Sequence, residues 1–236
     1  MTAFSSFYKR QLTVELRYEP AYLIWDRAGT MWSEIARSFK NFKHTQVSPN
    51  LVVFQGDDRF DIAVGLERLA ITDLEPHSTE KTAGLCDDIA DLVTQFLNIG
   101  VLNRVGMRAQ HAIKAETLDD AKRMVREFDL IAVPSVSLFS IEPKNVAPVY
   151  KIEVDDGEMG YIAQLYAEER KLEFTPKANM KMDPIHQSVC ELVLDIDCFT
   201  KKSVRLESFN LGKWMSSWQK AINADMNKFL NLASVT

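Results

Sequence analysis

Two aspartates one residue apart are the residues of this chain best suited to chemistry. Asp195 and Asp197 lie in the apolar run CELVLDIDCF, with Glu191 four residues before the first of them. On a strand, residues at this spacing share one face and lie about 6.5–7 Å apart at their Cα atoms, so both carboxylates could approach one divalent cation. One hypothesis is therefore a metal-dependent enzyme that acts on phosphoesters through Asp195 and Asp197.

The alternation within the same run supports a simpler interpretation. Its even-numbered residues are all apolar, whereas the odd-numbered ones include Glu191, Asp195 and Asp197. This pattern is typical of an antiparallel strand that packs one face on the core and turns the other to water. A hard cation also prefers about six oxygen ligands, and no neighbouring loop offers the rest. We therefore expect no bound metal or other cofactor, and a water-facing position for both aspartates.

Two arginines on another predicted strand could meet these aspartates. In NRVGMRAQHAI, Arg104 and Arg108 lie on the polar face and alternate with apolar residues. Opposite charges on neighbouring strands stabilise a sheet by roughly 0.2–1 kcal/mol per pair. If a loop or helix covered this face, the arginines would form a fork for a carboxylate or phosphate, with the aspartates as their resting partners. Arg104, Arg108, Asp195 and Asp197 are thus the candidate ligand-binding residues, and no residue is assigned a catalytic role.

Several classes of protein are disfavoured by composition and by missing motifs. The sequence has no Walker A loop, GxGxxG, GxSxG, HExxH or EF-hand loop, and its three cysteines form no CxxC pair. A net charge of −5 argues against nucleic-acid or membrane binding. The short basic patch at Tyr8–Arg10 is interpreted as a solvated cap. Without a signal-like apolar segment near the N-terminus, we expect a cytoplasmic location.

Residues 1–116 follow a β-α-β-β-α-β order. Alternation predicts a strand over 12–18, and an apolar face at helical spacing that includes Trp25 and Trp32 predicts a helix that ends near Asn41. A hairpin follows with its turn at residues 56–58, and Gly65 marks a bulge in its second strand. A helix capped near Ser78 and the arginine-bearing strand complete a ferredoxin-like, split βαβ succession.

Residues 117–236 follow an α-β-β-β-β-α order. Thr117 and Asn210 are the predicted caps of the two helices, and the strands lie in VSLFSIEP, VAPVYKIEVDD, GYIAQLYAEERKLEF and ELVLDIDCF. The segment 160–174 also contains good helix formers, but we favour a strand. The whole chain is predicted to be α+β, with largely antiparallel sheets, helices packed on one face, and both halves joined in one compact body.

Three separated motifs resemble a sporadically distributed, uncharacterised bacterial family of similar length. NRVGMRAQHAI resembles its R-x-G-x-R strand, ELVLDIDCF its LLDID strand near the C-terminus, and WQKAINADMNKFLNL its closing amphipathic helix. The opening VELRY also fits that family. The resemblance implies a bacterial cytosolic accessory protein, carried with mobile or defence-related genes, and implies no known activity or cofactor.

Together these features favour a non-enzymatic binding protein. We expect it to recognise a protein partner or a small anionic ligand, as a monomer or a homodimer. The metal-dependent phosphoesterase is kept as the alternative hypothesis.

Overall fold

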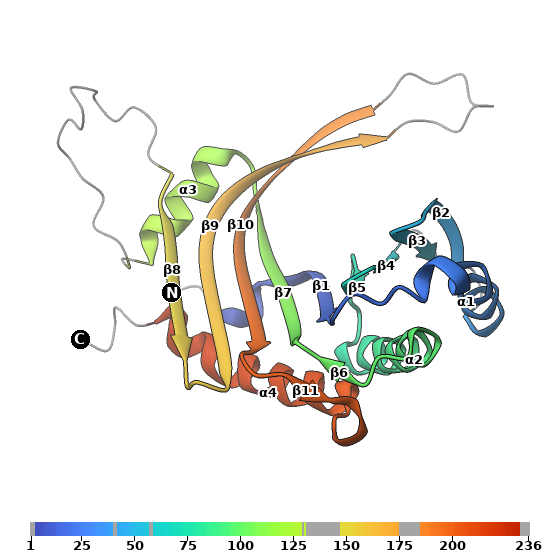
Figure 1. Cartoon of the computed structure of the whole chain (residues 1–236). Helices are drawn as coiled ribbons and strands as arrows, with labels where there is room; N and C mark the ends of the chain where they lie inside the picture. The colour runs from blue at the N-terminus through green and yellow to red at the C-terminus, as the bar shows by residue number, and fades with distance from the viewer. Residues whose placement is uncertain are drawn as a thin grey trace, which may run out of the picture.

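The computed structural model describes residues 3–39, 42–56, 59–128, 130, 147–174 and 185–231. In chain order the elements are η1 (Phe4–Ser6), β1 (Tyr8–Arg17), α1 (Ile24–Ser38), β2 (Phe42–Ser48), β3 (Leu51–Gly56), β4 (Phe60–Gly65), β5 (Arg68–Asp73), α2 (Thr79–Leu97), β6 (Val101–Leu102), β7 (Arg104–Ala115), α3 (Leu118–Glu127), β8 (Val149–Asp155), β9 (Met159–Phe174), β10 (Ile185–Thr200), β11 (Val204–Arg205), η2 (Leu206–Ser208) and α4 (Leu211–Leu230). Figure 1 labels these helices and strands.

Nine of the described strands form one sheet, in the order β2-β3-β4-β5-β1-β7-β10-β9-β8, and every neighbouring pair is antiparallel. The pairing of β7 with β10 joins strands from the two predicted halves of the chain. The long β9–β10 hairpin extends beyond the body of the molecule and curves as it rises (Figure 1). The remaining strands, β6 and β11, form a small separate ladder.

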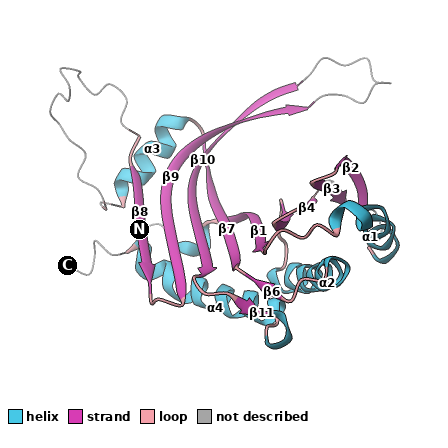
Figure 2. Ribbon diagram, viewed as in Figure 1, coloured by secondary structure: helices cyan, strands magenta, loops and turns pink. Residues whose placement is uncertain are grey.

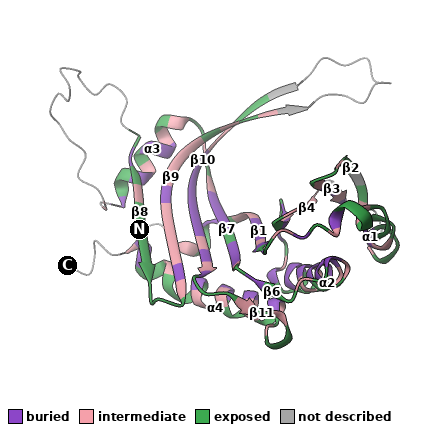
Figure 3. Cartoon of the chain, viewed as in Figure 1, coloured by how far each residue is buried: buried purple, intermediate pink, exposed green. Residues whose placement is uncertain are grey.

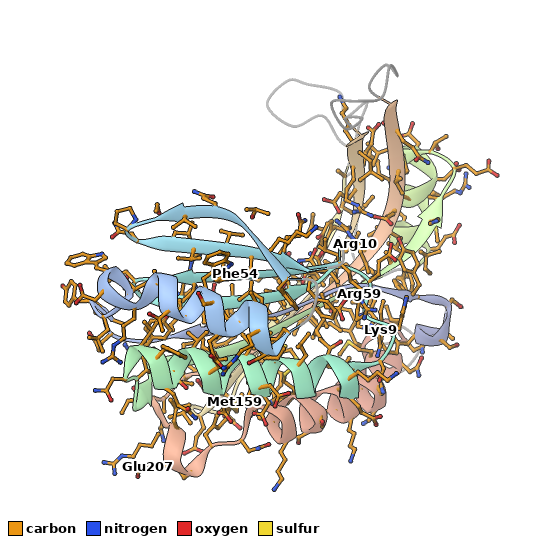
Figure 4. The ribbon with its side chains drawn as sticks, turned by 90° about the vertical axis from the view of Figure 1, so that its right-hand side faces the viewer. Lys9, Arg10, Phe54, Arg59, Met159 and Glu207 are labelled. Atoms are coloured by element: carbon orange, nitrogen blue, oxygen red, sulfur yellow. The ribbon has the colours of Figure 1, made fainter. Side chains whose placement is uncertain are left out.

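The helices pack on one face of the large sheet. α3 and α4 lie behind β8, β9 and β10, and α1 and α2 cover the part formed by β2 to β5 (Figure 2). The core lies between these layers and includes Val14 of β1, Met107 of β7 and Leu194 of β10, all at most 1% exposed. Phe54 of β3 is buried between the strands β2 to β5 and α1 (Figure 4). The opposite face of β1, β7, β10, β9 and β8, here called the polar face, carries the charged side chains.

These features confirm the predicted fold class. Residues 160–174 form a strand as favoured, and the odd-even alternation of β10 separates the core from the polar face as expected. The expected water-facing position is wrong for Asp195, which is buried and whose carboxylate accepts from Arg108 and Gln110. Ser78, Thr117 and Asn210 each accept a backbone N–H at the start of their helices, which confirms the predicted caps. The predicted strand in VSLFSIEP lies outside the described residues.

The first half differs from the sequence prediction at three places. The chain reverses after Gly65, so the single long strand with a bulge is two antiparallel strands, β4 and β5. β2 is an additional strand that sequence alternation did not reveal. Trp25 and Trp32 are 56% and 37% exposed, because α1 buries the neighbouring face that carries Met31. The ferredoxin-like description of this half stays a prediction, since β2 and β3 extend the sheet beyond it.

Candidate binding site

The pairing of β7 with β10 brings the four predicted site residues together. In this register Asp197 lies opposite Arg108, and Asp195 lies opposite Gln110. The side chains cross diagonally, however: Arg108 bonds to Asp195, and Arg104 bonds to Asp197. The predicted resting partnership between the arginines and the aspartates is therefore present in the structure.

Arg108 and Asp195 form a multiply bonded pair with unequal exposure. Arg108 Nε lies 2.9 Å from Oδ1 and 3.0 Å from Oδ2 of Asp195, and Nη2 donates to the same carboxylate. Gln110 Nε2 donates to Oδ2 at 3.2 Å. The Asp195 side chain is 6% exposed and that of Arg108 is 53% exposed. The bonds to Asp195 raise the pKa of Arg108 further above its ordinary value, so the guanidinium stays charged.

Arg104 is held by two carboxylates and an aromatic ring. Its Nη2 donates to Asp197 Oδ2 at 3.1 Å, and its Nη1 donates to Glu15 Oε1 at 3.4 Å. Its Cζ also lies 4.4 Å from the centre of the Phe199 ring, which is a cation–π geometry. Burial raises the pKa of Asp197 above its ordinary value, and the positive charge of Arg104 opposes that rise.

A shallow hollow of about 120 Å³ opens beside the Arg108–Asp195 pair. It is lined by Arg108, Ile162, Gln164, Asp195 and Asp197. Since the four described helices pack on the other face of the sheet, none of them covers this hollow (Figure 2). The cover that would make the arginines an enclosed fork is thus not supplied by any described helix.

One edge of the Arg108 guanidinium has no partner in the described part of the chain. Asp195 takes hydrogen bonds from Nε and Nη2, whereas no described acceptor lies within hydrogen-bonding distance of Nη1. An arginine carries five N–H donors, and a carboxylate occupies only one side of the fork. Arg108 can therefore hold Asp195 and still offer donors to a group that approaches from outside.

Both aspartates are poorly placed to bind a divalent cation. Each carboxylate already has a guanidinium as its counter-charge, and that positive charge opposes the approach of a second cation. Among the described residues, no group of three or more His, Cys, Asp or Glu side chains has an arrangement that could hold a metal ion.

None of the described helices is both long and apolar enough to cross a membrane.

A second charged cluster lies on the polar face, and the sequence did not predict it. Glu191 is fully buried and accepts hydrogen bonds from Tyr8, from Arg170 Nε at 3.0 Å and from Arg170 Nη2 at 3.2 Å. Arg10 Nη1 lies 3.2 Å from Glu191 and 2.5 Å from Glu168. We name these five residues the Glu191 cluster. Figure 4 shows Arg10 at the base of the β9–β10 hairpin.

Burial and hydrogen bonds within the Glu191 cluster shift the pKa values of Tyr8 and Glu191. Burial, followed by the hydrogen bond to Glu191, raises the pKa of Tyr8 to about 12. Burial alone would raise the pKa of Glu191, but the bonds from Tyr8 and Arg170 outweigh it, and the resulting pKa lies below the ordinary value. The only sequence signal for this cluster was that Glu191 shares a face with Asp195.

Comparisons of the chain with protein-family models, with curated proteins and with solved structures find no match.

Proposed function

We propose that the protein is a non-enzymatic, cytoplasmic binding protein whose polar sheet face binds an anionic group. The observation that carries this proposal is the state of Arg108, which is fixed by Asp195 and yet more than half exposed. A fixed guanidinium loses less conformational entropy on binding than a free one, so its remaining donors are prepared for a carboxylate or phosphate.

The size of the hollow favours a protein partner over a free small molecule. Sites for small molecules usually enclose about 300–1,000 Å³, whereas the hollow beside Arg108 is about 120 Å³ and open. A carboxylate carried on the surface of a partner needs no deep pocket, because the surrounding interface excludes water. Arginine and tyrosine are also enriched at the centres of protein interfaces, and Arg104, Arg108 and Tyr166 lie on this face.

The arginine pairing of Asp195 and Asp197 also supports binding over metal-dependent phosphoester hydrolysis. A hydrolytic metal would have to displace Arg104 and Arg108 from both carboxylates, which would leave two cations without partners. The bacterial family that the chain resembles adds the expectation of an accessory protein linked to mobile or defence-related genes.

Co-purification from the source cells, combined with arginine substitutions, tests the proposal. A charged hydrogen bond contributes about 1.5–3 kcal/mol, so Arg108→Ala should weaken partner binding roughly ten- to hundredfold. Arg108→Lys should recover only part of that loss, because an ammonium cannot hold Asp195 and a second carboxylate in a planar fork. Adding Arg104→Ala should abolish binding.

Arg123→Ala is the matched control, because Arg123 is an exposed arginine on α3 that pairs with Asp120 outside the site. Its partner binding should be unchanged. If the Arg104→Ala, Arg108→Ala double variant unfolds cooperatively and still retains the partner at the wild-type level, the proposal is wrong.

A further inference from the structure

The outer edge of β8 has the features of a strand that pairs with another chain. β8 ends the nine-stranded sheet, and no described strand pairs with its outer side. Its seven residues pair with β9 in an unbroken register, so the edge is regular. Figure 3 shows β8 as largely exposed, in contrast to β7 and β10. Val149 and Val154 are 56% and 55% exposed, which leaves apolar surface at this edge.

The sheet's other edge differs. β2 pairs with β3 through a register shift between His44 and Gln46. Irregularities of this kind twist an edge and discourage pairing with another chain. β8 lacks such protection within the described residues, and its only charged side chains inside the strand ends are Lys151 and Glu153.

The backbone N–H and C=O groups of β8 that do not bond to β9 belong to its odd-numbered residues. Asp156 N donates to Met159 O at 3.2 Å, so this pair is a hydrogen-bonded one in the β8–β9 ladder. Hydrogen-bonded and non-hydrogen-bonded pairs alternate along an antiparallel ladder. The N–H and C=O groups of Lys151 and Glu153 therefore point away from β9, toward whatever pairs with the edge.

The side chains of β8 favour antiparallel pairing with β8 of a second copy, and they favour one register of that pairing. Odd-numbered residues lie on the polar face, so a twofold dimer must pair odd with odd to keep both polar faces on one side. With the axis at Ile152, Lys151 of one copy faces Glu153 of the other, twice. Axes at Lys151 or Glu153 would instead place like charges opposite each other, which destabilises the pairing.

The same register matches the helix-side face of the strand. With the axis at Ile152, Val154 of each copy lies opposite Tyr150 of the other, and the two Ile152 side chains face each other. The half-exposed Val154 thereby gains an aromatic neighbour. The ring of Tyr150 itself packs against Phe229 of α4, with ring centres 5.5 Å apart.

We infer that the protein forms a homodimer by antiparallel pairing of two β8 strands about Ile152, which joins two sheets into one continuous sheet. The occupant of this edge is thus a second copy of the chain, selected by the Lys151–Glu153 charge complementarity. The inference does not depend on the function proposed for Arg108.

A charge swap tests the register directly by light scattering coupled to size-exclusion chromatography. The wild type should have twice the chain mass of 26.9 kDa. Lys151→Glu and Glu153→Lys should each place like charges opposite each other and weaken self-association about tenfold or more. The double variant K151E/E153K restores both cross-strand pairs and should be dimeric again.

Lys202→Glu is the matched control. Lys202 follows β10, is also exposed, and pairs with Glu158 in the turn between β8 and β9. This variant makes the same change of net charge as K151E and should stay dimeric. Cooperative thermal melts establish that each variant is folded. A monomeric wild type, single variants that remain dimeric, or a double variant that stays monomeric would each overturn the inference.

Discussion

Replacing the buried carboxylate of Glu191 should destabilise the fold more than replacing any exposed acid on the sheet. Glu191 has no exposed surface, accepts hydrogen bonds from Tyr8 and Arg170, and forms an ion pair with Arg10. Arg10 is 10% exposed, and its other carboxylate partner, Glu168, is 34% exposed. Glu191→Ala would leave Arg10 with that partner alone and Arg170 without an acceptor in the cluster.

The expected loss follows from the cost of leaving buried cations without a counter-charge. Removing one partner of a buried ion pair costs about 3–5 kcal/mol. Because Arg170 is one-third exposed and Glu168 still faces Arg10, the lower end applies, and we expect Glu191→Ala to lose about 3 kcal/mol. Glu191→Gln keeps an acceptor for Tyr8 and should lose about half as much.

Equilibrium urea unfolding measures these losses as changes in the free energy of unfolding. Glu169→Ala is the control, because Glu169 is a neighbouring exposed glutamate on β9, and a surface substitution of this kind changes stability by about 0.5 kcal/mol or less. A loss below about 1 kcal/mol for Glu191→Ala, with an unchanged urea dependence, would refute the account of the Glu191 cluster.

The same cluster predicts a pH dependence. The pKa of Glu191 in the folded protein lies below its ordinary value of 4.5, since the bonds from Tyr8 and Arg170 outweigh the effect of burial. In acid the unfolded chain therefore takes up this proton before the folded protein does. The stabilisation from Glu191 is complete above pH 4.5 and is lost as the pH falls through the lower folded pKa. Glu191→Gln should remove that part of the acid sensitivity.

Three further substitutions test other parts of the structure. His111 is buried, and neither ring nitrogen has a hydrogen-bond partner among the described residues. Burial lowers its pKa from 6.5 to about 4, so stability should fall by up to about 3 kcal/mol as the pH drops through that range. His111→Leu should flatten this dependence in thermal melts at several pH values. Asp73 is fully buried and accepts from Arg59 at 2.7 and 2.8 Å, so Asp73→Asn should cost about 2–4 kcal/mol in urea unfolding. Gly160→Ala would place a Cβ 2.5 Å from the Phe199 ring and should lower the melting temperature, at a cost of about 1–3 kcal/mol.

Local alternation was enough to predict the strand that carries the aspartates. In β10 the even-numbered residues Leu192, Leu194 and Ile196 are at most 2% exposed, as their pattern indicated. Period-two patterns report which face a side chain occupies, and that information lies within the strand itself. The meeting of Arg108 with Asp195 could be anticipated because both lie on polar faces of strands that had to pair somewhere.

The Glu191 cluster could not be predicted because it depends on pairing between distant segments. The sequence predicts a solvated basic cap at Tyr8 and Arg10, since the alternating pattern of β1 begins only at Leu12. In the structure β1 begins at Tyr8, and a register shift between Lys9 and Gln11 alters its pairing with β7 at that point. A shift of this kind leaves no signal in local hydropathy.

The missed reversal after Gly65 has a similar cause. The larger apolar residues are even-numbered from Phe60 to Leu66 and odd-numbered from Leu69, and this change predicts a bulge, yet β4 and β5 pair with each other through Val64 and Leu69. A bulge and a tight turn both shift the alternation by one residue, so the hydropathy pattern alone does not distinguish one bulged strand from two strands. Only the three-dimensional packing of the two strands separates them.

The most direct test of the proposed function is an NMR titration of the arginine Nε–H signals. Arg108→Lys assigns the Arg108 signal, because lysine lacks this group. On addition of acetate and of a glutamate-rich peptide, the Arg108 Nε–H signal should shift in a saturable manner, while that of the paired, exposed Arg123 should shift little. Equal or smaller shifts at Arg108 than at Arg123 would contradict the assignment of the polar face as an anion-binding surface.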